Sequence, residues 1–178
     1  LQACEKNHVG EWFEAVGLDL GSFGLRGPDK SILDGLSQDK YIFVDGSDGH
    51  AALVNDKVLE LIGIDENSVQ PFNGVIERRE GSLEPSGTLR ESSRDLVDKI
   101  RPKRKFDTSL AAMRGAIDLM NSHGITSAYD VWVGEHEMQV YKTLAETDEL
   151  TMRIRGAIID EGVYEKHVGD DFERVLRV

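Results

Sequence analysis

The feature that most constrains the fold of this chain is the alternation of helix-like and strand-like segments over residues 107–159. Asp107 or Thr108 can cap a helix that His123-Gly124 ends. In chain order we then expect a strand over 125–131, a helix over 135–146, a strand over 153–159 and a helix towards Val178. Strands that alternate with helices of about 10–14 residues are typical of βαβ units and a parallel sheet.

The first hundred residues predict shorter elements. In chain order we expect a helix or helix end over 1–15, a glycine-rich irregular stretch over 17–28, a short helix over 31–36, a strand over 41–44 and a helix over 51–62. The last of these has Val54, Val58, Leu61 and Ile62 on one face, and Gly63 stands where a helix ends. The strands over 41–45, 125–131 and 153–159 are predicted to be parallel members of one sheet, on which the helices near 51–62 and 108–121 pack.

Residues 71–91 differ in character from their neighbours. Val75 to Glu80 and Gly87 to Glu91 flank a Gly81-Ser82 turn, which predicts a polar hairpin or loop that stands apart from the sheet. Ser92 or Ser93 can cap a short helix that ends before Pro102.

Composition excludes several classes of function. The 178 residues carry 21 Lys and Arg against 33 Asp and Glu, a net charge of −12, which repels phosphate backbones and argues against nucleic-acid binding. The basic cluster over 101–105 is interpreted as a solvated linker, with a polyanion contact as the alternative. No apolar run approaches the ~20 residues of a membrane span. A soluble protein is expected, with the cytoplasm as the favoured compartment.

The ends and the single cysteine also carry information. Cys4 stands alone, which excludes an intrachain disulfide and zinc sites built from several thiolates. The N-terminus lacks both an initiator Met and a signal peptide, which favours an internal segment of a longer protein.

Two predicted strands end in residues that could do chemistry. One end is the Asp45-to-His50 run, which holds two carboxylates, an imidazole and glycines that permit close approach to a ligand. The alternative interpretation is that Asp48 caps the following helix and His50 lies exposed in its first turn. The other end is Tyr129 to Trp132. His136-Glu137 opens like a zinc-protease motif, but Val140 occupies the position of the second histidine.

The order of several short motifs resembles one family. They are Leu33-Asp34, Tyr41 to Val44, Asp48-Gly49-His50 through Asn55, Leu59 to Ile64, Asn73-Gly74-Val75-Ile76-Glu77-Arg78, Pro85 to Glu91, and His123-Gly124-Ile125-Thr126-Ser127 through Asp130. Taken together, over roughly residues 30–160, they resemble the amidohydrolase-3 branch of the amidohydrolase superfamily, which includes N-substituted formamide deformylase-like enzymes. Ala51 departs from the serine that is usual in that family.

The resemblance implies a fold and an activity. The fold class it implies is α/β, with 1–178 as the middle segment of a distorted (β/α)8 barrel that carries a hairpin or loop insertion at about 71–91. The implied activity is hydrolysis of C–N bonds in a small-molecule substrate by metal-activated water. The family's His-x-His pair and its other metal ligands are expected outside the chain. The parent would therefore hold a divalent metal, zinc being expected, and the fragment would hold none and be inactive.

The resemblance also implies roles for particular residues. His50 is expected to face substrate or metal, and Glu91 to lie near the metal, although Glu91 could instead begin the next helix. Asn55, Asp130 and Trp132 are the expected substrate-binding residues. Exposed sheet edges predict a homodimer. The alternative function is a non-catalytic α/β binding or interaction domain.

Overall fold

The computed structural model describes residues 10–158. The chain divides into two compact units, residues 1–102 and residues 103–178. Among the described residues, no helix is both long and apolar enough to cross a membrane. That residues 1–178 form one partial barrel domain stays a prediction.

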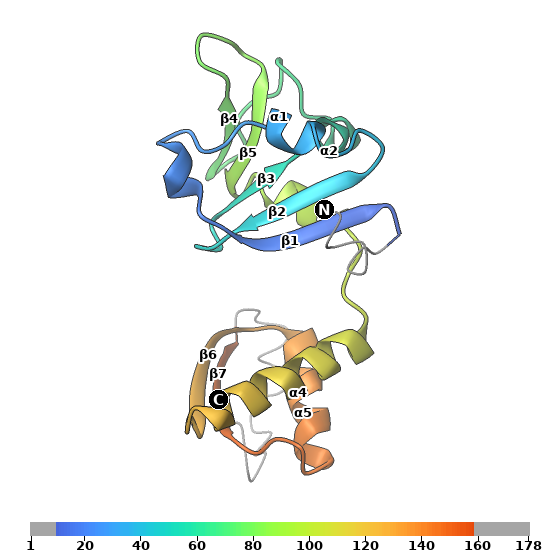
Figure 1. Cartoon of the computed structure of the whole chain (residues 1–178), viewed down its shortest axis with the longest axis vertical. Helices are drawn as coiled ribbons and strands as arrows, with labels where there is room; N and C mark the ends of the chain where they lie inside the picture. Colours follow the sequence, from blue (N-terminus) through green and yellow to red (C-terminus); the bar gives the residue numbers. More distant parts are fainter. Residues whose placement is uncertain (1–9, 159–178) are drawn as a thin grey trace. The chain divides into compact units, whose positions relative to one another are not determined.

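The first unit is built on a five-stranded sheet with the order β1-β2-β3-β5-β4 (Figure 1). Its strands are β1 (Trp12–Leu18), β2 (Tyr41–Gly46), β3 (Ala51–Val54), β4 (Gly74–Arg78) and β5 (Pro85–Glu91). β1 and β2 are parallel, whereas the β2–β3, β3–β5 and β4–β5 pairs are antiparallel. The short helices are the 3-10 turn η2 (Leu20–Phe23), α1 (Ser31–Asp34), α2 (Asp56–Ile62) and α3 (Asp95–Asp98).

The central strands of this sheet are buried on both faces. Phe43 and Val54 belong to one core cluster, while their neighbours Ile42 and Leu53 belong to another. A strand covered on both sides reads as a continuous apolar run and does not alternate. The run over 41–44 was recognisable as a strand for this reason. Residues 51–54 are likewise fully buried strand, and the predicted helix over 51–62 is confirmed only from Asp56 onward.

Three other expectations for the first unit are wrong. Residues 12–18 form a strand, although 1–15 predicted a helix or helix end, and residues 1–9 lie outside the described residues. The 74–91 hairpin exists but does not stand apart, because β5 pairs with β3 inside the sheet. Ser93 does not cap α3, which begins after Arg94. Its hydroxyl instead accepts from the Arg90 N–H and donates to the carbonyl of Val75.

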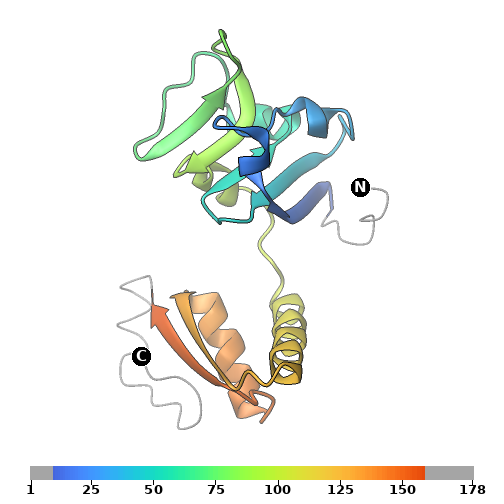
Figure 2. The same ribbon diagram turned by 60° about the vertical axis from the view of Figure 1, so that its left-hand side comes forward.

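The second unit is a βαβ unit preceded by a long helix. Its elements are α4 (Phe106–Ser122), β6 (Ser127–Val133), α5 (Glu135–Glu146) and β7 (Arg153–Ile158). β6 and β7 are parallel, and their inner face packs with both helices in one apolar cluster that includes Ile117, Val133, Leu144 and Ile154 (Figures 1 and 2). These four elements are confirmed, but α4 starts after Lys105 without a side-chain cap, contrary to the expectation for Asp107 or Thr108. The helix expected towards Val178 lies outside the described residues.

The prediction of one parallel sheet is wrong. β2 lies in the largely antiparallel sheet of the first unit, and β6 and β7 form a separate two-stranded sheet. A sequence of strands and helices predicts parallel pairing only where a helix crosses between consecutive strands. In the described residues that condition holds for β6–α5–β7 and for β1 and β2, whose connection contains η2 and α1. The barrel itself stays a prediction, and the largely antiparallel sheet of residues 12–91 does not have the all-parallel pairing that a barrel segment needs.

Candidate functional site

The structure brings His50 and Glu91 together at one end of the first unit's sheet. His50 closes the turn between β2 and β3, and Glu91 is the last residue of β5. The β3–β5 pairing places them side by side, because the Glu91 N–H donates to the His50 carbonyl at 2.8 Å. Their side chains also meet, with 3.2 Å between His50 Nδ1 and Glu91 Oε2. Both are open to solvent, with side-chain exposures of 69% and 56%.

The turn before β3 fixes the backbone of His50. Asp48 Oδ1 accepts the His50 N–H at 2.9 Å, and Gly49, at φ +72°, donates its N–H to the carbonyl of Gly46. Backbone N–H groups that donate to its carboxylate, that of His50 first and that of Ala51 next, lower the pKa of Asp48. Asp48 therefore caps a hairpin turn. The alternative interpretation, in which it caps a helix with His50 in the first helical turn, is wrong because β3 follows.

Glu91 has an unusual backbone conformation. Its φ of +50° lies in the left-handed region, which residues other than glycine rarely adopt. It does not begin a helix, since α3 starts four residues later at Asp95. Strained backbone at a residue with a functional side chain is a feature of active and binding sites. The strain and the contact with His50 together mark this strand end as the candidate site.

Sequence reasoning missed one residue beside this pair, Arg94, which binds both Asp45 and the turn that carries His50. Arg94 Nη2 donates to Asp45 Oδ2 at 2.9 Å, and Arg94 Nη1 donates to the carbonyl of Gly49 at 2.6 Å. Both side chains are 21% exposed. Asp45 belonged to the run of residues already expected to do chemistry, but nothing in the sequence pointed from Arg94 to Asp45 and Gly49, which lie 49 and 45 positions before it.

Asn55 lies at the other end of β3 from His50. The intervening strand makes that separation roughly 16 Å, at ~3.3 Å per residue. Its side chain is buried and faces backbone: Oδ1 accepts from the N–H groups of Ile42 and Val58, and Nδ2 donates to the carbonyl of Lys40. The structure does not bring Asn55 to the His50–Glu91 pair.

Asp130 and Trp132 belong to the second unit, near the carboxyl end of β6. Asp130 Oδ2 accepts the hydroxyl of Tyr141 at 2.7 Å, and Oδ1 accepts the Trp132 N–H at 3.1 Å. Burial, reinforced by Asp130, raises the pKa of Tyr141 well above its ordinary value. Trp132 is 71% exposed, so its indole is available to a ligand.

The described residues do not fit a divalent metal on their own. Residues 10–158 contain no group of three or more His, Cys, Asp or Glu side chains placed to hold one. His50 and Glu91 together supply two donors, fewer than the three protein ligands of a catalytic zinc site.

Comparison with known proteins decides the family. The amidohydrolase family model matches residues 1–177. The chain belongs to the amidohydrolase family. This membership agrees with the resemblance that the ordered motifs indicated, including the formamide deformylase-like branch.

Two curated proteins are similar to parts of this amidohydrolase chain. An N-substituted formamide deformylase of Arthrobacter pascens is 24% identical over 144 residues, which is 78% of the chain and 26% of that protein. Protein LONG AFTER FAR-RED 3 of Arabidopsis thaliana is 26% identical over 129 residues, 72% of the chain and 22% of that protein. The chain therefore spans about a quarter of the length of these relatives.

Two crystal structures share the fold. They are uncharacterized metal-dependent hydrolases from Pyrococcus furiosus and Pyrococcus horikoshii OT3, with TM-scores of 0.54 and 0.55. Each is 20% identical to the amidohydrolase chain and matches 91% of it, but the match covers only 32% and 31% of those proteins. At this identity the likeness establishes the fold alone.

Proposed function

We propose that this chain is a segment of a metal-dependent hydrolase that cleaves C–N bonds of the amide type in a small-molecule substrate. The observation that carries the proposal is the contact between His50 and Glu91, two exposed polar side chains at the end of the sheet, one of them on strained backbone. Membership of the amidohydrolase family, and the similarity to an N-substituted formamide deformylase and to metal-dependent hydrolases, support the reaction class.

The pair has a defined chemistry. A carboxylate accepts hydrogen bonds, so a neutral His50 directs its Nδ1–H at Glu91, which leaves Nε2 as the hydrogen-bond acceptor of the ring. An imidazole oriented in this way can receive a hydrogen bond or a proton from a polar substrate. The contact with Glu91 holds the ring in this orientation. We assign His50 and Glu91 to the substrate-facing site.

The rest of the hydrolase is proposed to lie outside residues 10–158. The divalent metal, with zinc as the candidate, would be held by ligands from those other parts. In the barrel of the whole enzyme β6–α5–β7 would form one βαβ unit, beside which Asp130 and Trp132 would contact substrate. The 178-residue chain alone is then proposed to be inactive, and to associate as a dimer that light scattering can detect.

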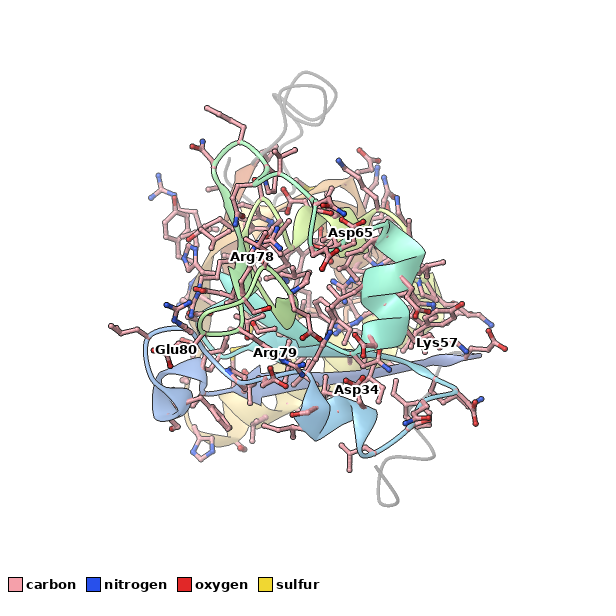
Figure 3. All side chains as sticks on the ribbon, turned by 90° about the horizontal axis from the view of Figure 1, so that it is seen from above. Asp34, Lys57, Asp65, Arg78, Arg79 and Glu80 are labelled. Carbon is pink, nitrogen blue, oxygen red and sulfur yellow. The ribbon has the colours of Figure 1, made fainter. Side chains whose placement is uncertain are left out.

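Activity measurements on the longer protein test this proposal. We expect Glu91→Gln and His50→Gln each to lower kcat/KM for N-substituted formamides or amides by about 10²-fold, the low end for loss of a general acid or base. Metal content measured on the same samples should stay unchanged. Glu80→Gln is the matched control, because Glu80 lies in the β4–β5 turn at the far end of the hairpin (Figure 3). Equal activity of all variants, or no hydrolase activity in the longer protein, would contradict the proposal and favour a binding domain.

A further inference from the structure

We propose that Arg94 is the positioning residue of the His50–Glu91 pair, acting by fixing the orientation of the Gly49–His50 peptide. This inference rests on the proposed function only for its catalytic consequence, and its structural content stands by itself. Arg94 touches neither His50 nor Glu91 through its guanidinium, so its effect passes through the turn that carries His50.

The Gly49–His50 peptide is held from both sides. Its carbonyl accepts from Arg94 Nη1 at 2.6 Å, and its N–H donates to Asp48 Oδ1 at 2.9 Å. Gly49 is at φ +72°, and glycine permits rotation of this peptide more freely than any other residue. The two hydrogen bonds therefore oppose the motion that the glycine allows. Rotation of this peptide would change the backbone angles at His50 and the direction of its side chain.

Arg94 also connects the two segments that carry the pair. Its backbone N–H donates to the carbonyl of Glu91 at 2.9 Å, so the residue follows β5 closely while its side chain reaches back to the β2–β3 turn. Asp45, the penultimate residue of β2, anchors the guanidinium through Nη2 at 2.9 Å. One side chain thus joins the end of β2, the turn and the end of β5.

The ion pair between Arg94 and Asp45 makes fewer hydrogen bonds than a side-on arrangement of the two groups would make. A side-on, two-pronged pair between Arg94 and Asp45 would also use Nε and Oδ1. Both of these atoms are buried without a hydrogen-bond partner in the described residues. An unsatisfied buried polar atom is costly. The guanidinium instead donates one hydrogen bond to Asp45 and one to the Gly49 carbonyl, and the second of these fixes the turn.

Lysine cannot reproduce this arrangement in full. The planar guanidinium presents several N–H groups in a fixed fork and reaches two acceptors that lie apart, whereas an ammonium is a single charged point. We expect Arg94→Lys to keep one of the two contacts and to restore the position of His50 in part. Arg94→Ala removes both contacts.

Imidazole nitrogen NMR of the 178-residue chain tests the inference. At pH 9, where an ordinary imidazole is neutral, the two ring nitrogens report the ratio of the Nδ1–H and Nε2–H tautomers. We expect His50 in the parent chain to favour Nδ1–H through its contact with Glu91. In Arg94→Ala the ratio should fall to that of a histidine-containing model peptide, and in Arg94→Lys it should be intermediate.

Arg79→Ala provides the matched control. Arg79 is likewise a partly exposed arginine that pairs with carboxylates, those of Asp29 and Glu84, but it lies at the turn end of the β4–β5 hairpin, away from Glu91 (Figure 3). It should leave the His50 ratio unchanged, which separates positioning from general destabilisation. If Arg94→Ala does not fold, Asp45→Ala takes its place, with an intermediate ratio expected because the Gly49 contact remains.

The outcomes are separable from those of the proposed function. A parent-like His50 ratio in a folded Arg94→Ala chain, or an equal loss in Arg79→Ala, overturns the positioning role. A loss confined to Arg94→Ala supports it, even if Glu91→Gln leaves the longer protein fully active. That last result would refute the catalytic proposal alone. If both hold, Arg94→Ala should lower kcat of the longer enzyme more than it changes KM.

Discussion

Replacing Asn55 by alanine should destabilise the first unit far more than an ordinary asparagine substitution. The side chain is 1% exposed and is both the cap of α2 and a bridge to two strand-end backbone groups. Removing it orphans the buried Ile42 N–H, now bonded to Oδ1 at 3.0 Å, at a cost of about 1–3 kcal/mol. Loss of the helix cap, in which Oδ1 accepts the Val58 N–H at 3.4 Å, adds about 1 kcal/mol.

The sum is a loss of about 2–4 kcal/mol in the free energy of unfolding. Loss of the hydrogen bond from Asn55 Nδ2 to the Lys40 carbonyl adds little to this free energy, because the contact is only partly buried and water can take the place of the Asn55 amide. Urea unfolding followed by Trp12 fluorescence measures this loss, because Trp12 is a buried member of the first unit's core. With a slope of about 1–2 kcal/mol/M, the urea midpoint should fall by about 1–4 M.

An exposed asparagine serves as the control. Asn67→Ala should change the free energy of unfolding by less than about 0.5 kcal/mol. A loss of that small size for Asn55→Ala, with an unchanged slope, would refute the reasoning. It would return Asn55 to the role of a substrate contact, in which truncation affects binding and leaves the fold intact.

Three other substitutions have defined outcomes. Glu91→Gly should be about 0.5–1 kcal/mol more stable than Glu91→Ala in urea unfolding, because glycine adopts the left-handed conformation of residue 91 without strain. Equal stabilities of the two variants would show that the backbone at this position is not strained. The hydrogen bond from Arg79 lowers the pKa of Asp29, so its stabilisation is present above the ordinary value of 3.8 and is lost as the pH falls below it. Thermal melting at pH 7 and pH 3 should therefore differ less in Arg79→Ala than in the parent chain. Burial raises the pKa of Tyr141, so the contribution of its neutral side chain to stability is present below pH 10 and is lost as the pH rises beyond 10. Tyr141→Phe should therefore remove the fall in melting temperature at alkaline pH.

Elements with a clear period or clear end signals could be predicted from the sequence. α5 and β7 follow from the 3.6-residue pattern of Met138, Tyr141 and Leu144 and the short apolar run after it. The hairpin was visible in its Gly81-Ser82 turn. The prediction was wrong where tertiary packing determines the secondary structure. Residues 51–54 are buried on both faces of the sheet, so they lack the apolar–polar alternation that would distinguish a strand from the start of a helix.

The candidate site was partly accessible to sequence reasoning. His50 and Glu91 were both expected, but their contact depends on β3 pairing with β5, and no local signal carries the register of that pair. Arg94 was missed because its partners, Asp45 and Gly49, lie about 45–49 residues earlier in the chain. Asn55 was expected to contact substrate but is a buried helix cap. An asparagine can serve in either role, and only its burial in the structure distinguishes the two.

The most direct test of the account is the hydrolysis of N-substituted formamides by a longer protein that contains this chain and retains its metal. We predict that Glu91→Gln lowers kcat/KM by about 10²-fold without changing metal content or the melting temperature of the first unit, while Glu80→Gln leaves all three quantities unchanged. Full activity in the Glu91→Gln enzyme would contradict the assignment of the His50–Glu91 pair to the substrate-facing site.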